Sequence, residues 1–324
     1  MILLRVADIS KRGESEFALK DISFNQARFQ KIAIVGETGS GKSTLLKIIA
    51  GLIEPDNGMV LIGNERVEGP SKRLVPGNSS IAYLSQYFDL PKFLRVEQIL
   101  AYANTLSQKE ARMLYEICQI DHLLARKTDQ LSGGERQRIA MARLLTTSPR
   151  LLLLDEPYSH LDMVHKNILK SVVRDITRKL KITCILVSHD PTDILPWADK
   201  ILAMKDGQII QEGTPEQVYR WPVNEYVAGL LGRYLKLNSE LAKAISGLTK
   251  SGKIEKNIFY RPECFKIASK KKRGLKGKVA SISFFGSYYE IDIQYSQTII
   301  TIRTTAGNLE TGDDVYFSLS DESM

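Results

Sequence analysis

The sequence predicts an α/β fold with a mixed sheet and a helical subdomain, followed by a small all-β, barrel-like module. Two short runs, at residues 151–154 and 184–187, are apolar on every side, which is typical of central strands in a parallel sheet covered on both faces. Residues 164–180 predict the crossover helix between them, and residues 96–150 also have a largely helical pattern. Residues 289–295 instead alternate strictly between apolar and polar side chains, which indicates a half-buried strand of the β module.

A glycine-rich loop at residues 36–43, Gly-Glu-Thr-Gly-Ser-Gly-Lys-Ser, fits the phosphate-binding pattern G-x-x-x-x-G-K-[ST]. It follows a short apolar run of strand type and precedes a helical pattern, so the loop lies at a helix N-terminus, where anions bind. Glycine lets main-chain N–H groups approach phosphate oxygens, which side chains would obstruct. Lys42 would face the β/γ-phosphates, and the Ser43 hydroxyl is placed to ligate Mg²⁺. The predicted ATP-binding residues here are Gly36, Glu37, Thr38, Gly39, Ser40, Gly41, Lys42, Ser43 and Thr44.

Composition limits the class of protein. A chain of 324 residues has room for two domains, and no apolar run approaches the roughly 18 residues that span a bilayer. The N-terminus lacks the pattern of a secretory signal, and the three cysteines lie far apart, as reduced thiols of a cytosolic protein do. The net charge of +8 could favour an anionic membrane surface or nucleic acid, but such a charge more often marks only a basic, well-solvated surface.

Two adjacent acids follow the apolar run at residues 151–154. Asp155 would hold Mg²⁺ directly or through water, because this cation prefers oxygen ligands and keeps several waters. Glu156 would point into the same site and polarise the attacking water as a general base. Without a phosphate loop upstream, the same pair could simply mark the exit of a strand.

A capped helix precedes these acids. Ser132 and Glu135 have the spacing of a capping box, so we expect a helix that begins at Ser132 and is ended by Pro149. Gly133 and Gly134 leave the N-terminal amides of this helix uncovered, which makes a second anion site.

The glycine loop, the capped helix and the two acids, in this order, resemble the ABC (ATP-binding cassette) ATPases. The signature of that family is usually Leu-Ser-Gly-Gly-Gln, and this chain has Glu in the last place. The resemblance implies that the signature contacts the ATP of a partner subunit; its residues are Ser132, Gly133, Gly134 and Glu135.

Other positions are carried over from the family one at a time. Gln86 resembles the glutamine that senses Mg²⁺ and couples the site to a partner, and His189 resembles the switch histidine that contacts the γ-phosphate. Ser159 and Asp162 belong to a segment that resembles the loop crossing to the second subunit. The family usually stacks adenine on an aromatic ring upstream of the glycine loop, and Phe17 is the aromatic residue available, although it fits a core strand equally well.

The resemblance extends over about residues 1–230 and predicts an ATP-binding domain at residues 1–232, with its helical subdomain at about 88–150. Residues 233–258 form the predicted linker, whose Leu235, Leu237 and Leu241 could pack on the ATP-binding domain. Residues 259–324 resemble the small TOBE-type β module of importer subunits, with Arg261-Pro-Glu263 and Phe285-Gly286 among the matching segments. The run Lys270-Lys-Lys-Arg273 predicts a solvated loop, with a lipid or nucleic-acid contact as the alternative.

The resemblance implies an ATPase that uses ATP and Mg²⁺ and drives solute translocation. A single phosphate loop and a single signature imply a head-to-tail homodimer, because each ATP of this family lies between two subunits. We therefore expect the energy-coupling subunit of an ABC importer, cytoplasmic and peripheral on the inner face of the cell membrane. Its partners would be transmembrane permease subunits on separate chains, and the resemblance also allows a solute-binding protein. The alternatives are an export-type transport ATPase and a non-transport ABC ATPase acting on ribosomes or DNA, although no nucleic-acid partner is expected.

Overall fold

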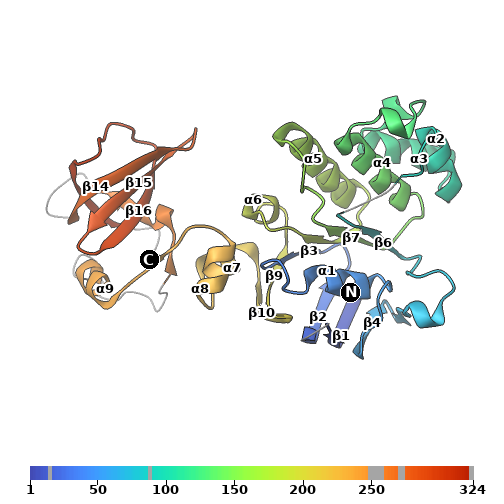
Figure 1. Ribbon diagram of the computed structural model, residues 1–324, viewed down its shortest axis with the longest axis horizontal. Coiled ribbons are helices and arrows are strands. Elements are labelled where there is room, and N and C mark those ends of the chain that lie inside the picture. The colour runs from blue at the N-terminus through green and yellow to red at the C-terminus, as the bar shows by residue number, and fades with distance from the viewer. Residues whose placement is uncertain (14–16, 87–89, 247–258, 269–273, 321–324) are drawn as a thin grey trace. The chain divides into compact units, whose positions relative to one another are not determined.

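The computed structural model describes residues 1–13, 17–86, 90–246, 259–268 and 274–320. The chain divides into two compact units, Met1–Glu216 and Gln217–Met324, which are described in turn (Figure 1).

The first unit is built on a six-stranded sheet with the order β10-β9-β3-β8-β7-β6. Its strands are β3 (Lys31–Val35), β6 (Ile81–Leu84), β7 (Leu151–Asp155), β8 (Thr183–Val187), β9 (Lys200–Lys205) and β10 (Gln208–Gly213). The first five of these pair in parallel, and β10 runs antiparallel to β9. Every residue of β7 and β8 is buried, as their apolar runs predict, so the prediction of a mixed sheet with covered central strands is confirmed.

An antiparallel sheet with the order β2-β1-β4-β5 lies beside α1 (Figure 1). Its strands are β1 (Ile2–Arg12), β2 (Phe17–Ala27), β4 (Asn57–Ile62) and β5 (Glu65–Arg66). Together with α1 (Lys42–Ile49), this sheet covers one face of β7, because Leu151 and Leu153 share a core cluster with residues of α1, β1 and β2.

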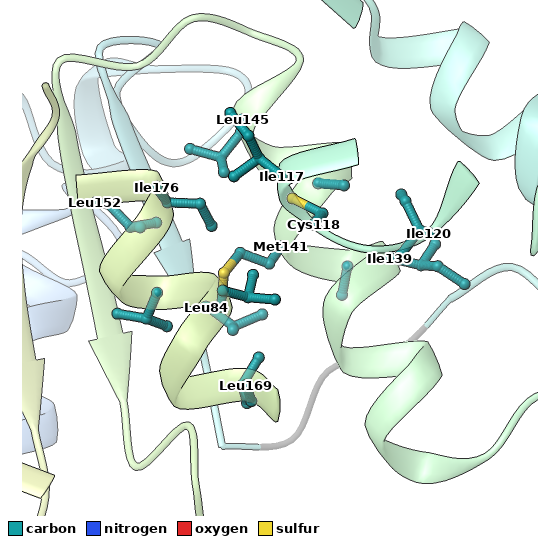
Figure 2. Packing of buried hydrophobic residues seen from close by; sticks show 14 of the residues in the cluster. Leu84, Ile117, Cys118, Ile120, Ile139, Met141, Leu145, Leu152, Leu169 and Ile176 are labelled. Carbon is teal, nitrogen blue, oxygen red and sulfur yellow. The ribbon is translucent and has the colours of Figure 1, made fainter. Parts of the chain in front are cut away.

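Helices cover the opposite face of the central sheet. The helical subdomain contains α2 (Val96–Ala103), α3 (Gln108–Ile117) and α4 (Gly133–Leu145), and α5 (Met163–Lys179) is the crossover between β7 and β8. Figure 2 shows their common core, in which Met141 of α4 and Ile176 of α5 lie with Leu84 and Leu152 of the sheet. The helical subdomain is thus anchored to the strands that lead to the candidate site.

The second unit contains a five-stranded, entirely antiparallel sheet with the order β13-β17-β14-β15-β16, and its barrel-like curvature matches the predicted β module. The strands are β13 (Phe265–Ile267), β14 (Leu275–Phe284), β15 (Tyr289–Tyr295), β16 (Thr298–Thr304) and β17 (Asp314–Leu319). The elements before it are α7 (Pro215–Arg220), α8 (Glu225–Leu230), β11 (Leu235–Lys236), α9 (Ser239–Ser246) and β12 (Phe259–Tyr260).

The predicted linker carries part of the C-terminal core. Leu241 is buried in the same cluster as residues of β14–β17, and Leu235 and Leu237 pack against that cluster. These leucines thus have apolar partners within the second unit itself. Along the chain, the first compact unit ends at Glu216 and the second begins at Gln217, whereas the sequence places the domain boundary after Gly232. The basic run at residues 270–273 lies outside the described residues.

Candidate nucleotide-binding site

The predicted phosphate loop connects the end of β3 to the first residue of α1, Lys42. Gly41 is the N-cap of this helix and has φ 93°, a left-handed conformation that glycine adopts without strain. A Cβ atom on Gly36 would lie 2.4 Å from the carbonyl oxygen of Met204, and one on Gly41 would lie 2.4 Å from that of Ala18. A Cβ on Gly39 would meet nothing within 4 Å. Gly36 and Gly41 are thus required by the packing of the loop against its neighbours, which adds to the reason inferred from the sequence.

The side chain of Lys42 is hydrogen-bonded to the loop that precedes it. Its Nζ donates to the carbonyl oxygens of Gly36, at 2.9 Å, and Glu37, at 2.7 Å, and to Ser40 Oγ at 3.3 Å. Burial lowers the pKa of Lys42, while the nearby charges of Glu156, Asp155 and Glu37 act in the opposite direction. The ammonium therefore lies among the loop carbonyls and faces the acids at the end of β7. Glu37 and Thr38 are exposed on the loop, and Thr44 lies in the first turn of α1.

Asp155 ends β7 and is 4% exposed. Its Oδ1 accepts a hydrogen bond from Ser43 Oγ at 3.0 Å, and its Oδ2 accepts one from the Tyr83 hydroxyl at 2.9 Å. The adjoining oxygens of Ser43 and Asp155 fit Mg²⁺, which binds through one or two carboxylates, phosphates and water. In the described part of the chain, no group of three or more His, Cys, Asp or Glu residues is arranged to hold a metal ion.

Glu156 follows directly and takes φ 50°, an uncommon conformation for a residue with a side chain. Its backbone N–H donates to Val187 O at 3.0 Å, and its Oε2 lies 2.9 Å from His189 Nδ1. Burial raises the pKa of Glu156, while His189 and Lys42 oppose this rise. A half-buried carboxylate held by a histidine can accept a proton from water. The structure thus brings together two residues that the sequence separates by a crossover helix.

Ser132 is the N-cap of α4, which begins at Gly133. Its Oγ accepts from the N–H of Glu135 at 3.2 Å, and Glu135 Oε2 accepts from the N–H of Ser132 at 2.8 Å, so the predicted capping box is confirmed. The helix ends at Leu145, four residues before the predicted stop at Pro149. A Cβ on Gly133 would meet no atom within 4 Å, so one side of this helix start is open.

Comparison with known proteins agrees with this geometry. Residues 19–159 match the family model described as ABC transporter. The chain is 30% identical to the spermidine/putrescine import ATP-binding protein PotA of Clostridium acetobutylicum, over 97% of this chain and 93% of that protein. The chain belongs to the ABC transporter ATP-binding family. It is also 32% identical to the molybdate/tungstate import ATP-binding protein WtpC of Pyrococcus horikoshii, over 98% of this chain and 97% of that protein.

Solved structures give the same family. The cassette aligns with cbiO1 from Clostridium perfringens, part of the ABC transporter complex cbiONQ, at 28% identity and a TM-score of 0.58, over 67% of this chain and 90% of that one. The ADP conformation of the ATP-binding cassette MJ1267 shares the fold, with a TM-score of 0.60 at 24% identity, over 71% of this chain and 98% of that one. The chain is therefore an ATP-binding ABC ATPase. Among its described residues, no helix is both long and apolar enough to cross a membrane.

The loop predicted to cross to the second subunit is hydrogen-bonded to Glu156. Ser159 Oγ donates to the carbonyl oxygen of Glu156 at 2.7 Å. Asp162 caps α5 by accepting from the N–H groups of Val164 and His165, each at 3.0 Å. The loop leaves the site and starts a helix within a few residues.

Gln86 makes a contact that the sequence does not predict. Its Nε2 lies 3.4 Å from Nε2 of His160, in the loop that carries Ser159. Ser43 is therefore hydrogen-bonded to Asp155, whereas the amide of Gln86 lies against the loop that contains Ser159 and His160. Phe17 is the first residue of β2, and its side chain lies outside the described part of the structure.

Tyr83 is a site residue that sequence reasoning missed. It lies on β6 beside β7, where its register partner is Leu153, two residues before Asp155. A tyrosine in an apolar strand is an ordinary core residue, so nothing in the sequence pattern marks it. Only the pairing of β6 with β7 brings its hydroxyl to the carboxylate.

Proposed function

We propose that this chain is the ATP-hydrolysing, energy-coupling subunit of an ABC importer. The observation that carries the proposal is the carboxylate of Glu156, which lies next to Asp155, contacts His189 and faces the ammonium of Lys42. Support for import comes from the relatives, whose names describe import ATP-binding proteins for spermidine/putrescine, sulfate/thiosulfate and molybdate/tungstate. These solutes include both polycations and oxyanions, so the proposal is limited to the importer class.

The proposed chemistry uses the contacts of this chain. The loop of residues 36–44 and Lys42 bind the phosphates of ATP, and His189 acts beside the γ-phosphate. Ser43, Asp155 and Gln86 would hold Mg²⁺, which neutralises phosphate charge when bound. Glu156 accepts the proton of the attacking water, and its hydrogen bond to His189 fixes the direction of its carboxylate.

The proposed working unit is a two-fold homodimer. Each signature, Ser132 to Glu135, would contact the ATP of the partner subunit, since its helix N-terminus is a site for anions and the face at Gly133 is open. Ser159 and Asp162 would lie at the same interface. A similar cassette, MJ0796, has been solved as a dimer bound to ADP and phosphate, and this chain aligns with it at 26% identity with a TM-score of 0.55, over 66% of this chain and 99% of that one.

The proposed membrane partners are permease subunits on separate chains, with a solute-binding protein delivering the solute outside. The ATPase would then be peripheral on the inner face of the cell membrane. Co-purification of the tagged chain from membranes with a multi-spanning protein tests this arrangement. Sedimentation with ribosomes and no membrane protein would contradict it and would favour the non-transport class.

The catalytic part of the proposal is tested by Glu156→Gln. This change should leave ATP binding intact and slow hydrolysis by about 10²–10⁴-fold, the usual contribution of a positioned general base. It should also trap an ATP-bound dimer, which size-exclusion chromatography detects. Glu116→Gln, on the exposed side of α3, is the matched control and should hydrolyse ATP at the rate of the unchanged chain. Near-normal turnover by Glu156→Gln would remove Glu156 from the catalytic role.

A further inference from the structure

We propose that Tyr83 is a positioning residue that holds the carboxylate of Asp155 in the orientation needed for cation and phosphate binding. The inference rests on the proposed function and adds a residue to its site. Each oxygen of Asp155 has one donor: Ser43 Oγ lies 3.0 Å from Oδ1, and the Tyr83 hydroxyl lies 2.9 Å from Oδ2. Asp155 is almost fully buried, so an oxygen without a donor would be costly.

The position of the Tyr83 hydroxyl is determined by the sheet. Tyr83 pairs with Leu153 across the parallel ladder between β6 and β7, and its ring packs against the core cluster that includes Leu151 and Leu153. The ring and the ladder leave the phenol little freedom, so the hydroxyl is a fixed reference point for the carboxylate. Ser43, by contrast, lies on α1 and approaches from the phosphate loop.

The two hydrogen bonds differ in what they do when a cation binds. Ser43 is itself a proposed ligand, so its donation to Oδ1 competes with cation binding. Tyr83 acts on the other oxygen, Oδ2, and its hydrogen bond is compatible with a cation on the Oδ1 side. Groups that hydrogen-bond a ligating carboxylate orient it, and their loss typically weakens metal affinity about 10–100-fold.

Tyr83→Phe tests the inference because it removes the hydroxyl and keeps the ring. We expect the Mg²⁺ concentration that half-maximally stimulates binding of a fluorescent, non-hydrolysable ATP analogue to rise by about 10-fold or more. Affinity for the same analogue in EDTA should stay within about twofold, because the glycine loop and Lys42 are unchanged. The readout is binding, so it does not depend on turnover.

The matched control is Tyr115→Phe. Tyr115 is a half-buried tyrosine that packs against the helical core, so the change again removes one hydroxyl and keeps the ring. It should leave the Mg²⁺ midpoint unchanged. If Tyr83→Phe lowers the melting temperature but leaves the Mg²⁺ midpoint at the value of the unchanged chain, Tyr83 has a structural role alone and the inference is overturned. An equal loss of affinity with and without Mg²⁺ would overturn it too.

A double variant gives a second measurement. Because Tyr83 is inferred to act through Asp155, adding Tyr83→Phe to Asp155→Asn should move the Mg²⁺ midpoint by less than about twofold beyond Asp155→Asn alone. A full additional shift would show that Tyr83 acts by another route. Failure of the proposed function looks different, since the unchanged chain would then show no Mg²⁺-stimulated nucleotide binding at all.

Discussion

Gly39 and Gly41 of the phosphate loop have nearly the same backbone conformation, with φ 89° and 93°, but different surroundings. Gly41→Ala would place a methyl group 2.4 Å from the Ala18 carbonyl oxygen and 2.8 Å from Leu19 Cδ2, whereas Gly39→Ala adds it in open space. We therefore expect Gly39→Ala to cost only the backbone strain of about 1–3 kcal/mol, and Gly41→Ala to cost clearly more. Urea unfolding measures both variants.

The comparison also separates folding from nucleotide binding. Gly39→Ala should fold, so any loss of ATP affinity in this variant reports the approach of the phosphates to the loop rather than unfolding. Equal destabilisation by the two substitutions would contradict the packing of Gly41 against Ala18.

Two of the three cysteines are fully buried in the first unit. Cys118 and Cys184 have no exposed surface, and burial raises the pKa of the Cys118 thiol to about 12 and that of Cys184 even further. The thiolate is the reactive form, so we expect neither to react with iodoacetamide at about pH 8 until urea unfolds the chain. Peptide mass spectrometry checks this, with the half-buried Cys264 as internal comparison. Rapid labelling of native Cys118 would contradict the core packing in Figure 2.

The residues proposed to carry the chemistry could be selected from the sequence, but their contacts with one another could not. Asp155, Glu156 and His189 stand out because each follows an apolar strand, and carboxyl ends of parallel strands meet at one edge of a sheet. The contact of Tyr83 with Asp155 depends on the adjacency of β6 and β7, whose sequence separation is long. No local pattern contains that information.

At the scale of single elements, α4 shows how a local signal becomes structure. The Ser132 and Glu135 capping box satisfies N–H groups at the start of the helix. Ser132→Ala should therefore lower the free energy of unfolding by about 0.5–2 kcal/mol, as loss of an N-cap does. Chemical denaturation measures the loss.

Glu135→Gln is the control for this element, because glutamine also completes a capping box and is the usual residue of the family signature at this place. We expect its stability to stay within about 0.5 kcal/mol of the unchanged chain. A loss from Glu135→Gln as large as that from Ser132→Ala would mean that the charge of Glu135, which lies 3.6 Å from Arg126, contributes more than the cap.

Elements whose apolar residues recur at one regular spacing could be predicted from the sequence, and elements with an irregular spacing could not. The crossover helix was expected at residues 164–180 and is observed at Met163–Lys179. By contrast, β1 and β2 pair with several register shifts, and Asp8 and Asp21 have positive φ angles. Such bulges break the alternation of apolar and polar residues, so the sequence pattern does not mark the full length of these two eleven-residue strands.

At the scale of the whole molecule, one buried arginine ties together the segments of the second unit. Arg261 is 3% exposed, and its guanidinium donates to the carbonyl oxygens of Tyr219, Ala228, Gly232 and Arg233. These acceptors lie in and after α7 and α8. The sequence assigned three of them to the end of the ATP-binding domain and Arg233 to the start of the linker. A pairing between residues about 30–40 positions apart has no local signature, which is why the sequence could not place it.

This network predicts the effect of removing Arg261. Arg261→Met would keep much of the side chain's apolar volume but leave the buried carbonyl group of Ala228 without this donor, at a cost of about 1–3 kcal/mol. We expect a lower melting temperature for the second unit and unchanged ATP affinity, because the nucleotide-site residues all lie in Met1–Glu216. Differential scanning calorimetry with and without ATP measures both the melting temperature of the second unit and the stabilisation of the first unit by ATP. A loss of ATP affinity would contradict the assignment of this network to the second unit alone.

Truncation tests where the ATP-binding domain ends. A chain that stops at Glu216 keeps the phosphate loop, the signature, Asp155, Glu156 and His189 within one compact unit, so it should fold and be stabilised by ATP against heat. A chain that stops at Gly232 keeps α8 but loses Arg261, the donor to Ala228 and Gly232, and should be less stable or aggregate. Thermal unfolding and light scattering of the two truncated chains, each with and without ATP, decide between the boundaries. If the chain ending at Gly232 is the more stable of the two, residues 217–232 belong to the ATP-binding domain, as the sequence alone suggested.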